Sequence, residues 1–152
     1  MIDPFRWSEA FAVGDETLDE EHRAMVGLIN QICIDGGPDR FSSKAISLLS
    51  ELEFVSEAHF RNEERLLHRI EVEIDLHHLQ TVVHIAIEDH ARSHRRSLDA
   101  LHRLMERARG ASAGDGPRLC QELKSWFVDH AIGQEAQVKT ILQSTRHLSE
   151  VD

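Results

Sequence analysis

The chain has 152 residues, the size of one compact domain, and 41% of them are hydrophobic, which is enough for a buried core. Its formal net charge of −10 argues against nucleic acid and anionic membrane surfaces as partners, because both bind through clustered cations. Without an apolar run of roughly 20 residues or a basic-then-apolar leader, the sequence predicts a single cytoplasmic domain over residues 1–152.

The chain begins with a segment that predicts an irregular arm, residues 1–16, followed by a helix. Apolar residues in that helix recur every three or four positions as far as Cys33, which is typical of one helix face. Asp15 or Thr17 is its expected N-cap. The Gly-Pro stretch DGGPD at 35–39 is expected to end it.

A second helix is predicted to begin at Ser42 or Ser43, either of which can cap it. Its apolar face continues as far as Ile70. The next turn has no strong helix breaker, and we expect it within residues 71–78, with Asp75 as a possible cap of the following helix.

The second half of the chain predicts two more helices. A third apolar face runs from Val83 to Met105 and stops at the Gly-rich stretch 110–117, and a fourth runs from Leu119 to Leu148. No segment shows the alternation of a strand. Four long amphipathic helices therefore predict an all-α, antiparallel up-down-up-down four-helix bundle.

Eleven histidines stand out in a chain that has no tyrosine. Spacing alone is weak evidence for a site, because His/His and His/Glu pairs four residues apart also occur as exposed neighbours. Position is more informative, since six residues whose side chains can bind metal fall on the apolar faces of their own helices. They are His22, His59, Glu63, His90, His94 and His130. Burying them unpaired would cost roughly 1–3 kcal/mol each, so we expect them to meet.

The predicted helices place these residues at a common depth. His94 and His130 lie at similar distances from the stretch 110–117, so they should be level on neighbouring helices. Five imidazoles and a carboxylate exceed the roughly four ligands of a zinc site and suit two bridged metal ions. A second bridging carboxylate should then project near Glu63, and Glu135 is the best-placed candidate.

Four segments, in this order, carry the motifs of a known family. They are FAVGDETLDEEHRAMVGLIN (11–30), HFRNEERLL (59–67), DHARSH (89–94) and WFVDHAIGQE (126–135). Over almost its whole length the chain resembles the bacterial hemerythrins of the HHE type, which are non-haem di-iron bundles that bind dioxygen. We therefore expect two iron ions as the cofactor.

The resemblance implies a role for each of these residues. His90, His94 and His130 would hold one iron, and His22 and His59 would hold the second, leaving it one free position for dioxygen or another small diatomic or anionic ligand.

Two carboxylates, Glu63 and Glu135, would bridge the irons beside an oxo or hydroxo group. Trp126, Phe127 and Ala131 are the residues that the resemblance places around the ligand.

The chain departs from the family pattern at three points. Residue 135 is Glu where the family normally has Asp, and Ala131 replaces a larger apolar residue. His90 follows Glu63 by 27 positions, about a dozen more than usual, which predicts an extended hairpin of the second and third helices or a longer loop.

Several functions remain open at this stage. Within the di-iron interpretation, reversible dioxygen binding for carriage, storage or sensing competes with an oxidoreductase or sensor handling peroxide or nitric oxide, in which Glu135 alters or blocks the free iron position. A ferritin-like oxidase is disfavoured because no histidine has Glu three residues before it, and a histidine phosphotransfer bundle because it needs one exposed histidine. A carrier is favoured over an enzyme, and a protein partner or self-association stays open.

The six other histidines are expected to be solvated. They are His68, His77, His78, His84, His102 and His147.

Overall fold

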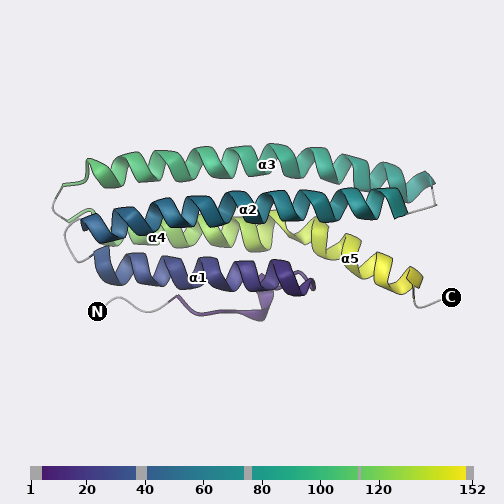
Figure 1. Ribbon diagram of the computed structural model, residues 1–152, viewed down its shortest axis with the longest axis horizontal. Coiled ribbons are helices and arrows are strands. Elements are labelled where there is room, and N and C mark those ends of the chain that lie inside the picture. The colour runs from purple at the N-terminus through teal and green to yellow at the C-terminus, as the bar shows by residue number, and fades with distance from the viewer. Residues whose placement is uncertain (1–4, 37–40, 74–76, 113, 150–152) are drawn as a thin grey trace.

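The computed structural model describes residues 5–36, 41–73, 77–112 and 114–149, and within these ranges the chain is helical without strands. The long helices are α1 (Glu16–Gly36), α2 (Ser43–Glu73) and α3 (His77–Arg109). A fourth segment consists of α4 (Gly116–Val128), the π-turn segment η2 (Asp129–Gln134) and α5 (Ala136–Ser149). These four segments lie side by side along one long axis (Figure 1). The prediction of an all-helical bundle is confirmed.

The helix starts follow the capping residues of the sequence. Asp15 Oδ1 accepts the N–H of Leu18 at 3.0 Å, and Ser42 Oγ accepts the N–H of Ala45 at 3.1 Å. In each predicted pair of candidates, the first residue is therefore the one that caps. The possible cap at Asp75 lies outside the described residues.

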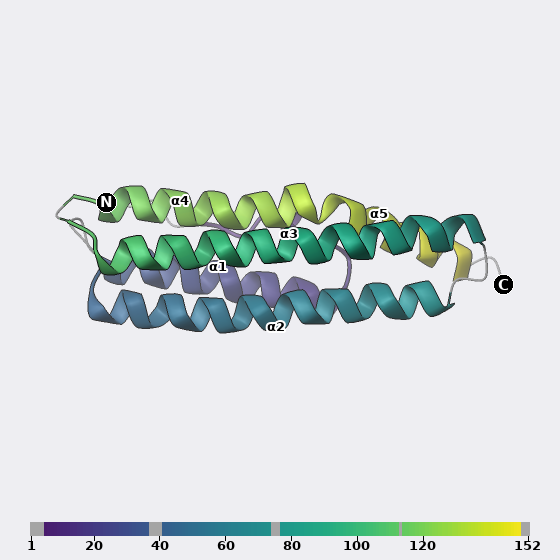
Figure 2. The same cartoon turned by 90° about the horizontal axis from the view of Figure 1, so that it is seen from above.

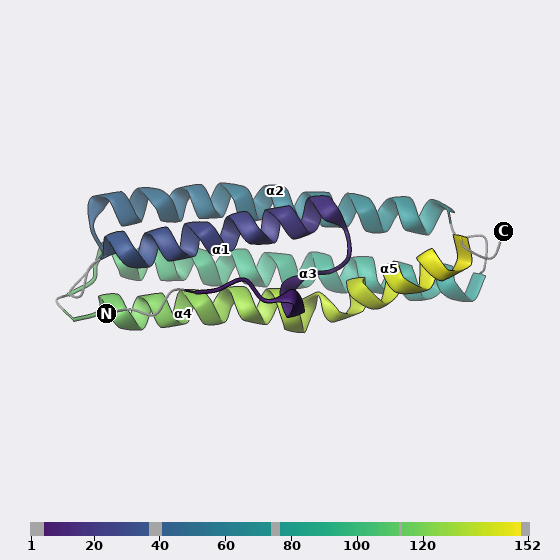
Figure 3. The ribbon, with the colours of Figure 1, turned by 90° about the horizontal axis from the view of Figure 1, so that it is seen from below.

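The segment before α1 passes beside α4 (Figure 3). It adds aromatic side chains to the core. It contains one short 3-10 turn, η1 (Glu9–Phe11). Phe5 packs edge-on against Phe11 and Phe127, with ring centroids 5.7 Å and 5.6 Å apart. Phe11 is buried, so this segment closes one side of the bundle.

Helices α2 and α3 continue well beyond the start of α1, and α5 lies alongside this extension (Figures 1 and 2). The added length is therefore helical, as the extended-hairpin prediction had it. The apolar core is accordingly divided into two clusters, one in the four-helix part around Ile29 and Leu101 and one in the extension around Leu67 and Val138. In the described residues, no helix is long and apolar enough to span a membrane.

Candidate metal centre

A layer of polar side chains separates the two apolar cores. It comes from α1, α2, α3 and the fourth segment, and none of its seven members is more than 3% exposed. These members are His22, His59, Glu63, His90, His94, His130 and Glu135. The structure thus brings together every residue predicted as a metal ligand, in two adjacent groups whose ligand atoms lie within 4.8 Å of one another in each group.

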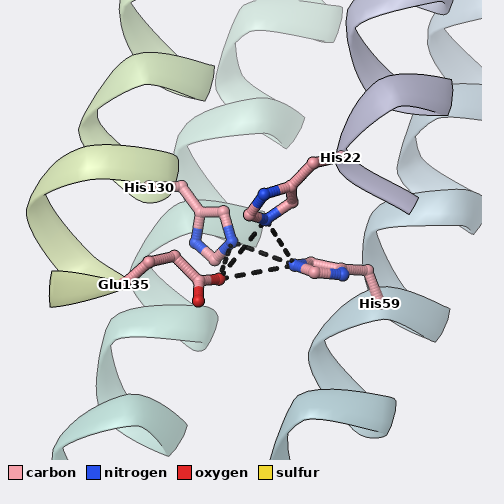
Figure 4. Close-up of side chains that lie close together, drawn as sticks. All are labelled: His22, His59, His130 and Glu135. Carbon is pink, nitrogen blue, oxygen red and sulfur yellow. Dashed lines mark hydrogen bonds and ion pairs between the residues drawn. The ribbon is translucent and has the colours of Figure 1, made fainter. Parts of the chain in front are cut away.

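The first group consists of three imidazoles and a carboxylate (Figure 4). His59 Nε2 lies 2.9 Å from His22 Nε2 and 3.1 Å from His130 Nε2. Glu135 Oε1 lies 2.6 Å from His130 Nε2, 3.4 Å from His22 Nε2 and 3.5 Å from His59 Nε2. One carboxylate oxygen and three ring nitrogens therefore converge on a single point.

The second group consists of Glu63, His90 and His94. Glu63 Oε1 lies 3.1 Å from His94 Nε2 and 3.5 Å from His90 Nδ1. The other oxygen, Oε2, lies 3.3 Å from Nε2 of His59, which belongs to the first group. Glu63 therefore faces both groups, one with each oxygen.

Four of the imidazoles are oriented by oxygen atoms outside the centre. The contacts at their Nδ1 atoms are His22 to the carbonyl of Phe11 at 2.7 Å, His59 to Glu21 at 3.1 Å, His94 to Glu64 at 3.4 Å and His130 to Gln134 at 3.0 Å. Carbonyl and carboxylate oxygens only accept hydrogen bonds, so the neutral rings carry their proton on Nδ1. Each Nε2 then presents a lone pair to the interior, the arrangement that proteins use for histidines that bind metal.

This arrangement leaves the interior short of positive charge. In the neutral rings, the Nε2 lone pairs of His22 and His130 each face that of His59 at hydrogen-bond distance, an arrangement that favours a cation between them. Among the described residues, the buried side-chain atoms without a hydrogen-bond partner are Oε2 of Glu63, both ring nitrogens of His90 and both carboxylate oxygens of Glu135. The ion-pair contacts of these atoms lack hydrogen-bond geometry. Borderline divalent or trivalent cations would satisfy the whole set, so the donors fit a pair of metal ions.

The pKa values of two residues respond to the same demand for positive charge. Burial acts to lower the pKa of His59, but Glu135, Glu21 and Glu63 raise it well above its usual value. Burial acts to raise the pKa of Glu135, but the charge of His130 and the contacts with Glu63 and His22 hold it well below its usual value. Both shifts have the same physical cause, which is that these side chains favour a positive charge between them.

The π turn of η2 brings His130 and Glu135 onto one face. In an α-helix, residues five apart point roughly 140° away from each other. Here the N–H of Glu135 donates to the carbonyl of His130 at 3.1 Å, which is the i to i+5 bond of a π turn. The sequence analysis predicted one last helix over this stretch and did not indicate the π turn within it. The available signal was the five-residue spacing of two polar residues with Ile132, which is exposed, between them.

The residues predicted around a bound ligand lie close to the centre. Phe127 is fully buried and packs edge-on against His22, with ring centroids 5.6 Å apart. Ala131 is buried directly after His130. Trp126 is turned toward α3, where its Nε1 donates to the carbonyl of Ser97 at 2.8 Å.

Sequence reasoning missed several residues that shape the centre. Phe60 stacks on His94 with its ring centroid 4.2 Å away and the two planes 9° apart. Glu21 lies on α1 directly before His22, yet it orients His59 on α2, and it also accepts a hydrogen bond from Asn62 at 2.6 Å. These contacts depend on how helices face each other, so no spacing within one helix could reveal them.

The other histidines lie away from the centre. His68, His84 and His102 have exposed side chains, as expected. The side chains of His77, His78 and His147 lie outside the described part of the chain. The division of ligands differs from the one that the resemblance implies, because His130 lies with His22 and His59.

Comparisons of the chain with a family model and with known proteins point to the same family. The family model described as the hemerythrin HHE cation binding domain matches residues 13–142. Two proteins named hemerythrin-like protein, from Naegleria gruberi and Naegleria fowleri, are each 28% identical over 140 residues, which cover 91% of this chain and 94% of theirs. With a family match over most of its length and the His/Glu clusters in its core, this chain belongs to the hemerythrin HHE cation-binding domain family.

Proposed function

We propose that the chain, as an antiparallel up-down-up-down bundle, holds two iron ions in this centre and binds dioxygen reversibly for carriage, storage or sensing. The observation that carries the proposal is the convergence of three imidazole lone pairs, each fixed from outside at Nδ1, on one buried carboxylate oxygen. A bound iron pair supplies the two electrons that reversible dioxygen binding requires.

The seven polar residues of the layer are the proposed ligands. Glu63 would bridge the two ions, which its contacts with His59 on one side and His94 on the other support. Glu135 would be the second bridging carboxylate. The outer oxygens of Glu21 and Gln134 hold His59 and His130 in the tautomer and orientation that binding needs.

The residues around the centre protect it from water. Phe127 and Phe60 place aromatic rings against His22 and His94, and the two apolar cores close the layer from both ends. The residue after His130 is Ala131, which presents only a methyl group to the centre. Exclusion of water and stray protons favours release of unchanged dioxygen over its reduction.

The test is an optical spectrum of the iron-loaded protein through repeated cycles of deoxygenation and aeration. The proposal predicts charge-transfer bands that appear with dioxygen, disappear without it and keep their amplitude over several cycles. His59→Ala should remove the cycle, whereas His102→Ala, which changes an exposed histidine, should leave it intact. A spectrum insensitive to dioxygen, or bands lost after one cycle, would contradict reversible binding.

A second candidate is an oxidoreductase or sensor that handles peroxide or nitric oxide. The position of Glu135 favours it, because Oε1 lies 3.4 Å and 3.5 Å from the Nε2 atoms of His22 and His59, the pair that the resemblance leaves with a free position. A carboxylate at that position would hinder dioxygen. Turnover of many equivalents of peroxide per centre would favour an oxidoreductase, whereas a stoichiometric reaction would exclude an oxidoreductase but not a sensor.

A further inference from the structure

Helix α2 continues past the point where α1 begins (Figure 3). A cavity of about 570 Å³ lies at this step. Its walls come from the start of α1 and from the stretch of α2 that follows the metal centre. Small-molecule sites in proteins usually have volumes of roughly 300–1,000 Å³. The cavity is therefore large enough for an organic molecule, and nothing in the proposed function uses it.

One wall of the cavity is cationic in a chain whose net charge is −10. Arg65 and Arg69 both line it, and since they are one turn apart on α2 their side chains share a face. Within the described ranges neither guanidinium has a carboxylate within ion-pair distance. The Asp15 carboxylate on the other wall already accepts the N–H of Leu18, and His68 faces Glu71 at 3.6 Å. The two arginines are thus the groups available for an anion.

Two leucines also line the cavity, beside polar side chains. Leu18 is buried beneath the cavity and Leu66 is half-buried beside it. Paired guanidinium groups bind carboxylates and phosphates through two parallel hydrogen bonds, whereas an apolar floor favours a hydrocarbon body. We infer that this cavity binds a small organic anion, with its carboxylate or phosphate between Arg65 and Arg69 and a short apolar body over Leu18 and Leu66.

The cavity also touches the support of the metal centre. Asn62 lines it and donates to Glu21 Oε2 at 2.6 Å, and Glu21 Oε1 lies 3.1 Å from Nδ1 of His59. The side chains of Asn62 and Glu21 therefore connect a bound anion to His59, which is a proposed metal ligand. Binding of the anion in the cavity does not require metal. A failure of anion binding can therefore be distinguished from a failure of the proposed dioxygen binding.

The test is isothermal titration calorimetry of the full chain with four probes. Hexyl phosphate and hexanoate carry both the anionic group and the apolar body, inorganic phosphate carries only the first and hexanol only the second. We expect saturable binding of one equivalent per chain for hexyl phosphate, hexanoate or both, and binding weaker by at least roughly tenfold for inorganic phosphate and hexanol. The comparison of the two amphiphiles tells phosphate from carboxylate.

Variants locate the site. Arg65→Gln and Arg69→Gln should each weaken binding about tenfold, the value of a charge-assisted hydrogen bond. Arg103→Gln changes an arginine that is exposed on α3 and does not line the cavity, so it should leave the dissociation constant unchanged. Arg65 and Arg69 are exposed, so their replacement should not disturb the fold, and circular dichroism checks that each variant is folded. Absence of saturable binding, equal affinity in the Arg65→Gln/Arg69→Gln double variant, or inorganic phosphate binding as tightly as hexyl phosphate would overturn the inference.

Discussion

Gln134 orients His130 from outside the metal centre. Its Oε1 lies 3.0 Å from His130 Nδ1, and its Nε2 donates to Ser97 Oγ at 3.0 Å, which ties η2 to α3. An amide fixed at both ends holds the ring more rigidly than water would. At the scale of single residues, such outer contacts decide how well the imidazoles are prepared for metal.

Replacing Gln134 with Leu should weaken iron binding while leaving the helix intact. Losing an outer partner of a metal-binding histidine typically lowers metal affinity by about 10–100-fold. Competition of the variant with a coloured iron chelator measures the change. Gln137→Leu is the matched control, because Gln137 is exposed on α5. Equal affinities of Gln134→Leu and wild type would show that this contact does not orient His130.

Shortening the carboxylate at position 135 should favour the oxygenated state. Glu135→Asp draws the oxygen back from His22 and His59, which lie 3.4 Å and 3.5 Å from it, and so frees space at the centre. We expect higher oxygen affinity or slower autoxidation, measured as the lifetime of the oxygenated spectrum after aeration. Identical lifetimes in the variant and wild type would contradict a restricting role for the longer side chain.

Among the elements, the π turn of η2 has the clearest consequence. It places one extra residue between His130 and Glu135, so removing one residue should restore an α-helix in which the two are four positions apart and still share a face. Deleting Ile132, which is 45% exposed, should therefore leave two iron ions per chain. Inserting one alanine after Ile132 instead adds a residue that the π turn does not absorb, so it should turn Glu135 away from His130 and reduce the iron content by at least one ion per chain. Loss of iron in the deletion variant, or full iron content in the insertion variant, would contradict this explanation of the turn.

The helices themselves could be predicted because their signals are local. The apolar spacing up to Cys33 and the capping oxygens of Asp15 and Ser42 lie within a few residues of the features they determine. The π turn could not be predicted in the same way, since its energetic cost is offset by contacts of Glu135 with residues on other helices. The hydrogen bond between His22 Nδ1 and the carbonyl of Phe11 could not be predicted either, because it depends on the path of the segment before α1.

For the whole molecule, the added length of α2 and α3 builds a second core with α5. Leu67 is completely buried in it, four residues after Glu63. Leu67→Ala should lower the free energy of unfolding by about 2–5 kcal/mol, measured by urea denaturation of the metal-free protein. Val72→Ala, at a side chain that is 84% exposed, should change it by less than about 0.5 kcal/mol. A similarly small effect at Leu67 would mean that the extension contributes little to stability.

The convergence of the seven polar residues was predictable at this scale for a simple reason. Residues on amphipathic helices of known length can meet only at a few depths, so polar groups on four apolar faces had to share one layer. Which residues belong to which half of the centre was not predictable, because His130 lies near members of both groups, with its Nε2 3.1 Å from His59 Nε2 and its ring centroid 5.9 Å from that of His94.

The most direct test of the account is iron-edge anomalous diffraction from crystals of the iron-loaded protein. We predict two iron peaks in the polar layer, one near each oxygen of the Glu63 carboxylate. One peak should lie next to His59 and the other next to His94. A single peak, or iron bound anywhere outside that layer, would contradict the claim that these residues form a two-iron centre.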